Sequence, residues 1–186
     1  MRGSWACVAA EPGILPVLER RETMDERVQR VTEMEARLNR IAAWLGEHTA
    51  PSDVIREDAR LLAEYYDGPL WRADFETDEA GGFPSGLPRG VLSEDGIYNA
   101  LAEYGERIRE TAFAEAVLAI RPGRYRHFKG NEYEVIGVAR NSEDDSPMVV
   151  YRALYGDGGL WCRPAAMWNE TVERDGTAYR RFERID

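Results

Sequence analysis

The spacing of apolar residues changes near Arg121, and this change limits the folds that are open to the chain. Before Arg121, apolar side chains recur at intervals of three and four, which is the period of amphipathic helices. After it, they alternate with polar side chains at a period of two, which is typical of half-buried strands. The sequence therefore predicts an α+β protein with a poorly ordered leader (1–23), a helical domain (24–120) and a β domain (121–186).

Three helices are expected in an antiparallel arrangement in the first domain. The first spans residues 25–47, and the second is expected to start at a cap formed by Ser52 or Asp53 and to end before Gly68-Pro69. The third follows a cap at Ser93. Residues 70–92 have no steady period and are rich in glycine and proline, so they predict an ordered loop whose aromatic side chains fold back onto the helices.

Short strands separated by turns are expected in the second domain. Runs rich in β-branched and aromatic residues lie at 133–139, 148–155, 160–163, 170–174 and 179–185, and polar or glycine-containing turns lie between the first three and between the last two. A single helical turn is expected at 164–167. This pattern predicts a small antiparallel β-barrel or curled sheet of the SH3-like kind.

The net charge of −10 belongs entirely to the helical domain. Residues 24–120 contain 20 acidic and 10 basic side chains, whereas residues 121–186 contain 11 of each. A nucleic-acid partner is disfavoured by this charge, because such partners select basic surfaces. Apolar runs stay short of the ~20 residues that a membrane span requires. Since two cysteines form no disulfide framework, a cytoplasmic location without a membrane partner is expected.

Two stretches of the chain resemble known bacterial families. The runs LWRADFETDEAGG and LPRGVLSEDGIYNALAEY resemble the domain-of-unknown-function family numbered 4298, over about residues 25–112. The runs YRHFKGNEYEVIGVARNSED, PMVVYRALYGDGGLWCRP and RRFERI resemble the family numbered 1653, over about residues 122–186. The resemblances imply a helical domain fused to a β-rich domain, with no established activity. Members of the second family often have a histidine at the position of Asn141, so a mechanism that needs this histidine is in doubt.

Aromatic and cationic residues interleave in the β domain and predict a binding face. Aromatic rings stack on planar groups, and arginine or lysine holds anions. Strand alternation places Cys162 on the face opposite its two neighbours, where we expect it to be buried. The predicted ligand-binding residues are Arg126, His127, Lys129, Tyr151, Trp161 and Arg163. The chain is thus interpreted as a binding or adaptor protein that recognises a small ligand, a peptide or an anionic group.

Two other functions remain open at this point. An enzyme would use His127 and Glu143 as an acid/base pair, although the sequence contains no motif for a nucleophile, a metal or a cofactor. A weak nucleic-acid-binding module is the second alternative.

The acidic run from Asp74 to Glu79 lacks the glycine of a calcium loop and is interpreted as a solvated loop. The helical domain is expected to engage a protein partner or to self-associate.

Overall fold

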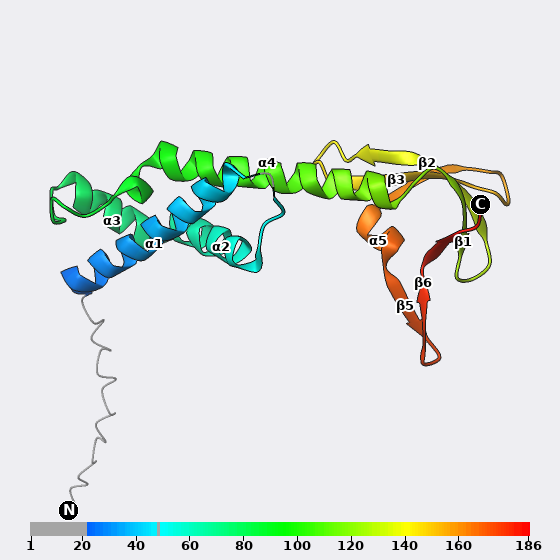
Figure 1. Ribbon diagram of the computed structural model, residues 1–186, viewed down its shortest axis with the longest axis horizontal. Coiled ribbons are helices and arrows are strands. Elements are labelled where there is room, and N and C mark those ends of the chain that lie inside the picture. Colours follow the sequence, from blue (N-terminus) through cyan, green and yellow to red (C-terminus); the bar gives the residue numbers. More distant parts are fainter. Residues whose placement is uncertain (1–21, 48) are drawn as a thin grey trace, which may run out of the picture.

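The computed structural model describes residues 22–47 and 49–186, so most of the predicted leader lies outside the described residues. Helices come first and strands follow, which confirms the α+β class (Figure 1). The helices are α1 (Met24–Leu45), α2 (Asp53–Asp67), α3 (Pro69–Glu79), the 3-10 turn η1 (Gly90–Leu92), α4 (Glu94–Ala119) and α5 (Ala165–Asn169). The strands are β1 (Gly123–His127), β2 (Glu132–Arg140), β3 (Pro147–Ala153), β4 (Leu160–Pro164), β5 (Thr171–Arg174), β6 (Thr177–Arg180) and β7 (Phe182–Arg184).

Side-chain caps fix the starts of three long helices. The hydroxyl of Thr23 accepts the backbone N–H of Glu26 at 3.2 Å, and the Glu26 carboxylate accepts the backbone N–H of Thr23 at 2.8 Å. Ser52 and Ser93 cap α2 and α4 through their hydroxyl groups, each at 3.3 Å from a backbone nitrogen. Such caps satisfy backbone donors that have no partner inside the helix. The local sequence therefore determines where these helices begin.

The prediction of a loop at 70–92 is wrong for the first part of this range, because helix α3 occupies Pro69–Glu79. The described chain accordingly contains five α-helices rather than three, and four of them precede the sheet. Pro69 stands at the first turn of α3, where its fixed φ and missing N–H are tolerated. Trp71 and Asp74 are the buried residues of α3. A carboxylate at a buried position conceals the helical period, because a search for apolar spacing passes over it.

A first core lies among the helices. The aromatic residues that were expected to fold back do so, since Trp71 and Phe83 are buried and Phe75 packs against them. The buried members of this first core are Val31, Leu38, Ile41, Ala59, Leu62, Tyr65, Trp71, Phe83, Val91, Leu92 and Ile97.

Two carboxylates are buried at the edges of the first core, and both are held by arginines of α1. Asp58 accepts hydrogen bonds from Arg37 at 2.7 Å and from Arg40 at 2.6 and 2.8 Å. Asp74 is fully buried and accepts two bonds from Arg30, at 2.8 and 2.7 Å. It also accepts the hydroxyl of Tyr65 at 2.8 Å. These ion pairs connect α1 to α2 and to α3. The interpretation of Asp74 as part of a solvated loop is therefore wrong.

The sheet is antiparallel but does not close into a barrel, so the barrel form of the prediction is wrong. Five strands pair in the order β4-β3-β2-β1-β7, while β5 and β6 pair separately as a hairpin (Figure 1). Closure would require β4 to pair with β7. The predicted strand at 179–185 is instead divided at Arg181, so only Phe182–Arg184 is left to pair with β1. Helix α5 stands close to the single helical turn that was expected.

A second core lies between the sheet and two helices. Trp168 of α5 stacks on Phe182 with ring centroids 3.8 Å apart and an interplanar angle of 4°. The buried members of this second core are Ala116, Ile120, Tyr125, Val135, Val149, Tyr151, Ala165, Trp168 and Phe182. Helix α4 therefore contributes to both cores, since Ile97 belongs to the first core and Ala116 to the second.

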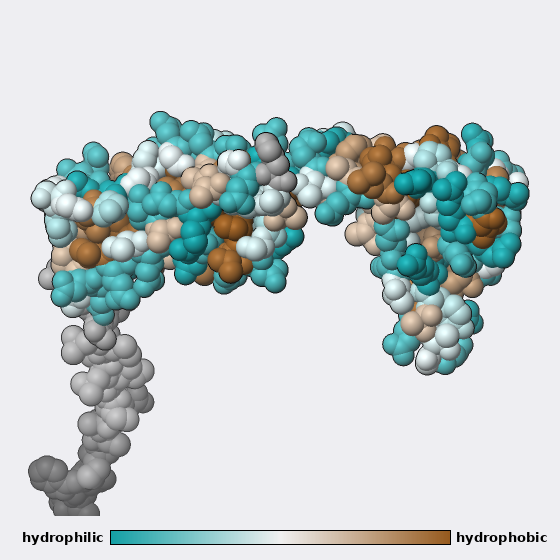
Figure 2. Space-filling model, viewed as in Figure 1, coloured by the Kyte–Doolittle hydropathy of each residue, from teal (hydrophilic) through white to brown (hydrophobic). Residues whose placement is uncertain are grey.

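The surface of the visible side is mainly hydrophilic. Figure 2 shows apolar surface gathered over the last turns of α4 and the adjoining sheet, where Val117 and Leu118 are exposed. None of the helices in the described residues combines the length and the hydropathy that crossing a bilayer requires.

Candidate functional site

A tight hairpin between β1 and β2 positions the residues of the candidate site. The backbone N–H of Gly130 donates to the carbonyl of His127 at 2.7 Å, and the N–H of His127 donates to the carbonyl of Asn131 at 2.8 Å. Gly130 has a φ of 99°, which a residue with a side chain rarely adopts. A three-residue loop of this kind commonly needs a glycine at its last position. The sequence His127–Asn131 thus presents Phe128 and Lys129 at the tip of the hairpin.

Phe128 is the centre of the contacts at this tip. Its ring lies 4.4 Å from the ring of His127 and 6.2 Å from that of Tyr179, measured between centroids. The ammonium of Lys129 lies 5.7 Å from the centre of the same ring. The backbone N–H of Phe128 donates to the carbonyl of Arg181 at 3.0 Å. This bond ties the hairpin to the chain between β6 and β7.

A hollow of about 400 Å³ opens beside this tip. Residues of the β1–β2 hairpin form one side of it, and residues of β6 and β7 form the other. Its lining residues are Arg126, His127, Phe128, Gly130, Ala178, Tyr179, Arg180 and Glu183. We call this hollow the hairpin site.

Positive charge prevails at the hairpin site. Arg126 forms an ion pair with Glu132 at 3.0 Å. Arg180 and Lys129 make no ion pair with any residue in the described part of the chain. Glu183 is the one carboxylate among the lining residues. The local field therefore favours an anion, although residues 121–186 are neutral as a whole.

His127 is held in its neutral form at this site. Partial burial lowers its pKa below the ordinary value of 6.5, and the positive charges of Arg181, Arg163 and Lys129 lower it further. Its Nδ1 accepts the backbone N–H of Lys129 at 3.3 Å. A neutral imidazole with an accepting Nδ1 carries its proton on Nε2, so Nε2–H is a hydrogen-bond donor. The charge of the site thus comes from arginine and lysine, and His127 adds a neutral donor.

Two family models match the chain. Residues 22–111 match a domain of unknown function (DUF4298), and residues 123–184 match a protein of unknown function (DUF1653). The chain is therefore similar to each family over a separate segment. One solved structure, a protein belonging to DUF1653 from Bordetella bronchiseptica, is 39% identical over 37% of this chain and 91% of its own length, with a TM-score of 0.35. No curated protein matches the chain. The two resemblances expected from the sequence are confirmed, and the hairpin site lies in the DUF1653 segment.

The structure brings together four of the six predicted ligand-binding residues of the DUF1653 segment. Arg126 and His127 line the hairpin site, and Lys129 lies next to it on Phe128. The guanidinium of Arg163 lies 5.6 Å from the ring of Phe182, and that ring lies 4.9 Å from the ring of His127. Arg163 therefore flanks the site from β4. The binding role of these residues stays a prediction.

Tyr151 and Trp161 do not reach the hairpin site. They are partners across β3 and β4, so they share the sheet face that Arg163 also occupies. Tyr151 is buried in the second core, with its ring 5.1 Å from that of Trp168. Trp161 is 61% exposed on the edge strand. Cys162 points to the opposite face as expected, but it is exposed rather than buried. Its burial was a wrong prediction, because α4 and α5 pack against the inner face of the sheet alone.

Glu143 lies far from His127. Glu143 belongs to the β2–β3 turn, where its backbone N–H donates to the Asn141 side chain at 3.3 Å. His127 stands at the other end of β2, and the nine residues of that strand span on the order of 25 Å. The described structure therefore does not assemble the acid/base pair that the enzyme alternative requires.

Tyr179 and Arg180 were not singled out by the sequence analysis. They lie some fifty residues from His127 in the chain and reach it because β7 pairs with β1, with Phe182 opposite His127. The alternation in Thr177–Arg180 indicates a strand, but it does not identify the pairing partner. The signal in the sequence is the closing run RRFERI, which predicts a strand and supports the family resemblance but does not indicate that this strand pairs with β1.

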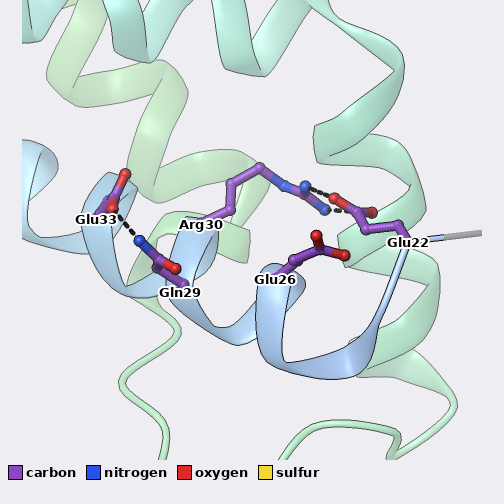
Figure 3. A pocket seen from close by; sticks show the side chains of 5 residues that line it. All are labelled: Glu22, Glu26, Gln29, Arg30 and Glu33. Carbon is purple, nitrogen blue, oxygen red and sulfur yellow. Dashed lines mark hydrogen bonds and ion pairs between the residues drawn. The ribbon is translucent and has the colours of Figure 1, made fainter. Parts of the chain in front are cut away.

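A second hollow lies along α1 and is not a candidate site. It is lined by Glu22, Glu26, Gln29, Arg30 and Glu33 (Figure 3). Figure 3 shows Arg30 directed at Glu22 and Gln29 directed at Glu33. The side-chain amide of Gln29 donates to Glu33 at 3.0 Å. Glu26 takes part in the helix cap at Thr23. The polar groups of this hollow thus already have partners, either within the lining or at Thr23. Throughout the described ranges, no group of histidine, cysteine or acidic side chains is arranged to hold a metal ion.

Proposed function

We propose that the DUF1653 segment binds an anionic ligand that carries a planar group, and that the chain acts as a binding or adaptor protein through this segment. The observation that supports this proposal is the hairpin site. There, Lys129 and Arg180, which make no ion pair within the described residues, lie beside the contacting rings of Phe128 and Tyr179. A small molecule or a peptide side chain with a carboxylate or phosphate has the matching chemistry.

Each part of the ligand has a counterpart at the site. The guanidinium of Arg180 forms charge-assisted hydrogen bonds with carboxylate or phosphate oxygens. Nε2–H of His127 adds a donor that keeps its character at neutral pH. Tyr179 is 42% exposed, so its ring is open to stacking by a planar group. The proposal rests on these contacts rather than on any catalytic arrangement.

Phenyl phosphate and inorganic phosphate provide a direct test. We expect phenyl phosphate to bind more tightly, because it combines the anion with a ring, and to shift the amide resonances of Phe128, Lys129 and Gly130 in an NMR titration. Arg180→Ala should weaken its binding by about tenfold, since one charge-assisted contact contributes about 1.5 kcal/mol. Arg152→Ala is the matched control, because Arg152 is an exposed arginine on the outer face of β3.

Two results would contradict the proposal. One is equal loss of binding in the Arg180 and Arg152 variants, which would indicate non-specific attraction of anions. The other is equal affinity for the two phosphates, which would remove the aromatic contribution. A short single-stranded oligonucleotide added in place of phenyl phosphate tests the nucleic-acid alternative, which predicts an affinity that falls steeply with salt.

A further inference from the structure

A hollow of about 520 Å³ lies in the DUF4298 segment, far along the chain from the hairpin site. It is formed where α2 ends and α3 begins, and the start of α4 borders it. Its lining residues are Tyr66, Asp67, Gly68, Trp71, Arg72, Phe75, Glu76 and Glu94. We call it the aromatic hollow.

Three aromatic rings form a continuous wall of the aromatic hollow. The rings of Tyr66 and Trp71 meet edge to face, with centroids 5.0 Å apart and an interplanar angle of 72°. The rings of Trp71 and Phe75 stack at 5.2 Å with an angle of 21°. The indole N–H of Trp71 donates to the carbonyl of Val91 at 3.0 Å. Because Trp71 is buried and hydrogen-bonded, the wall has a fixed centre, while Tyr66 and Phe75 remain partly exposed.

Negative charge prevails at the rim of the aromatic hollow. Asp67, Glu76 and Glu94 supply three carboxylates, and Arg72 supplies the one positive charge among the lining residues. Arg72 faces Glu76 at 3.5 Å on the surface. Asp67 and Glu94 make no ion pair with any residue that the structure describes. The hollow therefore carries an excess of two negative charges, within a segment that holds the whole negative excess of the chain.

Aromatic faces combined with carboxylates select organic cations. A ring face attracts an alkylated ammonium group, and the attraction grows as the group is removed from water. A metal ion needs several oxygen ligands at one point, and within residues 22–47 and 49–186 no group of acidic residues has that arrangement. We propose that the aromatic hollow binds an organic cation of the alkylammonium class, with the rings contacting its alkyl groups and the carboxylates balancing its charge. This proposal is independent of the hairpin site.

Choline and its neutral isostere 3,3-dimethylbutan-1-ol test the proposal with the full chain. The two molecules have the same shape and differ in charge. We expect choline to shift the indole N–H resonance of Trp71 in an NMR titration, with an affinity about tenfold above that of the isostere, because the ring faces attract the cation and not the carbon analogue. Glu76→Gln combined with Glu94→Gln should weaken choline binding, whereas Glu103→Gln, an exposed carboxylate on α4 away from the hollow, should not.

Phe75→Leu separates the role of the ring from a role in packing. Leucine keeps an apolar side chain against the first core, so the helices stay folded, but the aromatic face is lost. We expect about fivefold weaker choline binding in this variant. Equal binding of choline and the isostere, or unchanged choline binding in both the Phe75 and the Glu76/Glu94 variants, would overturn the proposal.

Discussion

The two cores of this chain are stabilised by different chemistry. The first core, among the helices, borders on two buried carboxylates that arginines of α1 hold, whereas the second core consists of packed aromatic rings around Trp168. Among the described residues, Asp58 and Asp74 are the buried charged side chains, and both belong to helices. Long arginine side chains can extend from one helix to a carboxylate on the next. Ion pairs of the sheet, such as Arg126 with Glu132, lie at the surface instead. The second core therefore depends on ring area, since one aromatic side chain removes about 150–250 Å² from water.

Trp168→Ala is expected to have the largest effect and to act on the second core alone. Loss of the indole removes the stack on Phe182 and the contacts with Tyr125 and Tyr151, which should lower the free energy of unfolding by about 4 kcal/mol. Hydrogen exchange should accelerate in β2 and β3 while α1 and α2 stay protected.

Two further variants are controls for the Trp168→Ala prediction. Met167→Ala, at the exposed neighbouring position, should change the free energy of unfolding by less than about 0.5 kcal/mol. Trp168→Phe should be milder than Trp168→Ala, because the indole N–H has no hydrogen-bond partner in the described structure and a ring is retained. Equal acceleration of exchange in the helices would contradict the separation of the two cores.

Asp74→Asn is expected to have the next largest effect, on the first core. The amide keeps the shape of the carboxylate but leaves the guanidinium of Arg30 without its buried counter-charge. We expect a loss of roughly 3 kcal/mol in the free energy of unfolding, measured by urea denaturation. Glu57→Gln, which breaks an exposed ion pair with Arg60, should leave the stability almost unchanged. A similar loss of stability in both variants would show that the burial of Asp74 does not increase the contribution of its ion pair.

The stability of the two cores should also depend on pH in different ranges. These changes in the free energy of unfolding are the smallest effects that we expect. The folded state lowers the pKa of His127, so protonation favours the unfolded chain, and the β segment should lose stability as the pH falls below 6.5. The hydrogen bond from Arg40, supported by Arg37, lowers the pKa of Asp58, so the stability that this carboxylate contributes is lost only below pH 3.8. Thermal unfolding between pH 7 and 5 should therefore change in the β segment and not among the helices.

His127→Gln is the control for the pH prediction. This variant should remove the dependence of the β segment between pH 7 and 5, while the acid transition of the helices stays where it is. Asp58→Asn should instead alter the acid transition of the helices and leave the dependence of the β segment between pH 7 and 5 unchanged. If the β segment of the His127 variant still loses stability below pH 6.5, another group is responsible and the assignment is wrong.

Local signals predicted the parts of the fold that depend on neighbours in the chain. Helices α1, α2 and α4 follow from apolar spacing and from hydroxyl caps such as Ser52 and Ser93, all within a few residues. Helix α3 was missed because Asp74 occupies a buried position, and its burial depends on Arg30, which lies 44 residues away. The open sheet was missed because closure depends on which strands pair, and the break at Arg181 leaves β7 with three residues.

The candidate site was predictable to the extent that one hairpin forms it. Arg126, His127 and Lys129 are adjacent in the sequence and remain adjacent in the structure. Tyr179 and Arg180 join them through pairing of β7 with β1, which no local pattern specifies. Glu143 was placed with His127 on the assumption of a closed barrel mouth. The strand between them instead keeps these residues apart.

Helix α4 connects the two segments that match the family models. Residues 112–122 are matched by neither family model, yet they contain Ala116 and Ile120, which are buried in the second core. The α4 helix is 26 residues long, or about 39 Å, and runs without interruption from one core to the other. The junction is therefore a packed component of the β segment rather than a tether. A fragment starting at Arg121 would expose the ring surfaces that these two side chains cover, whereas one starting near Glu110 would retain them.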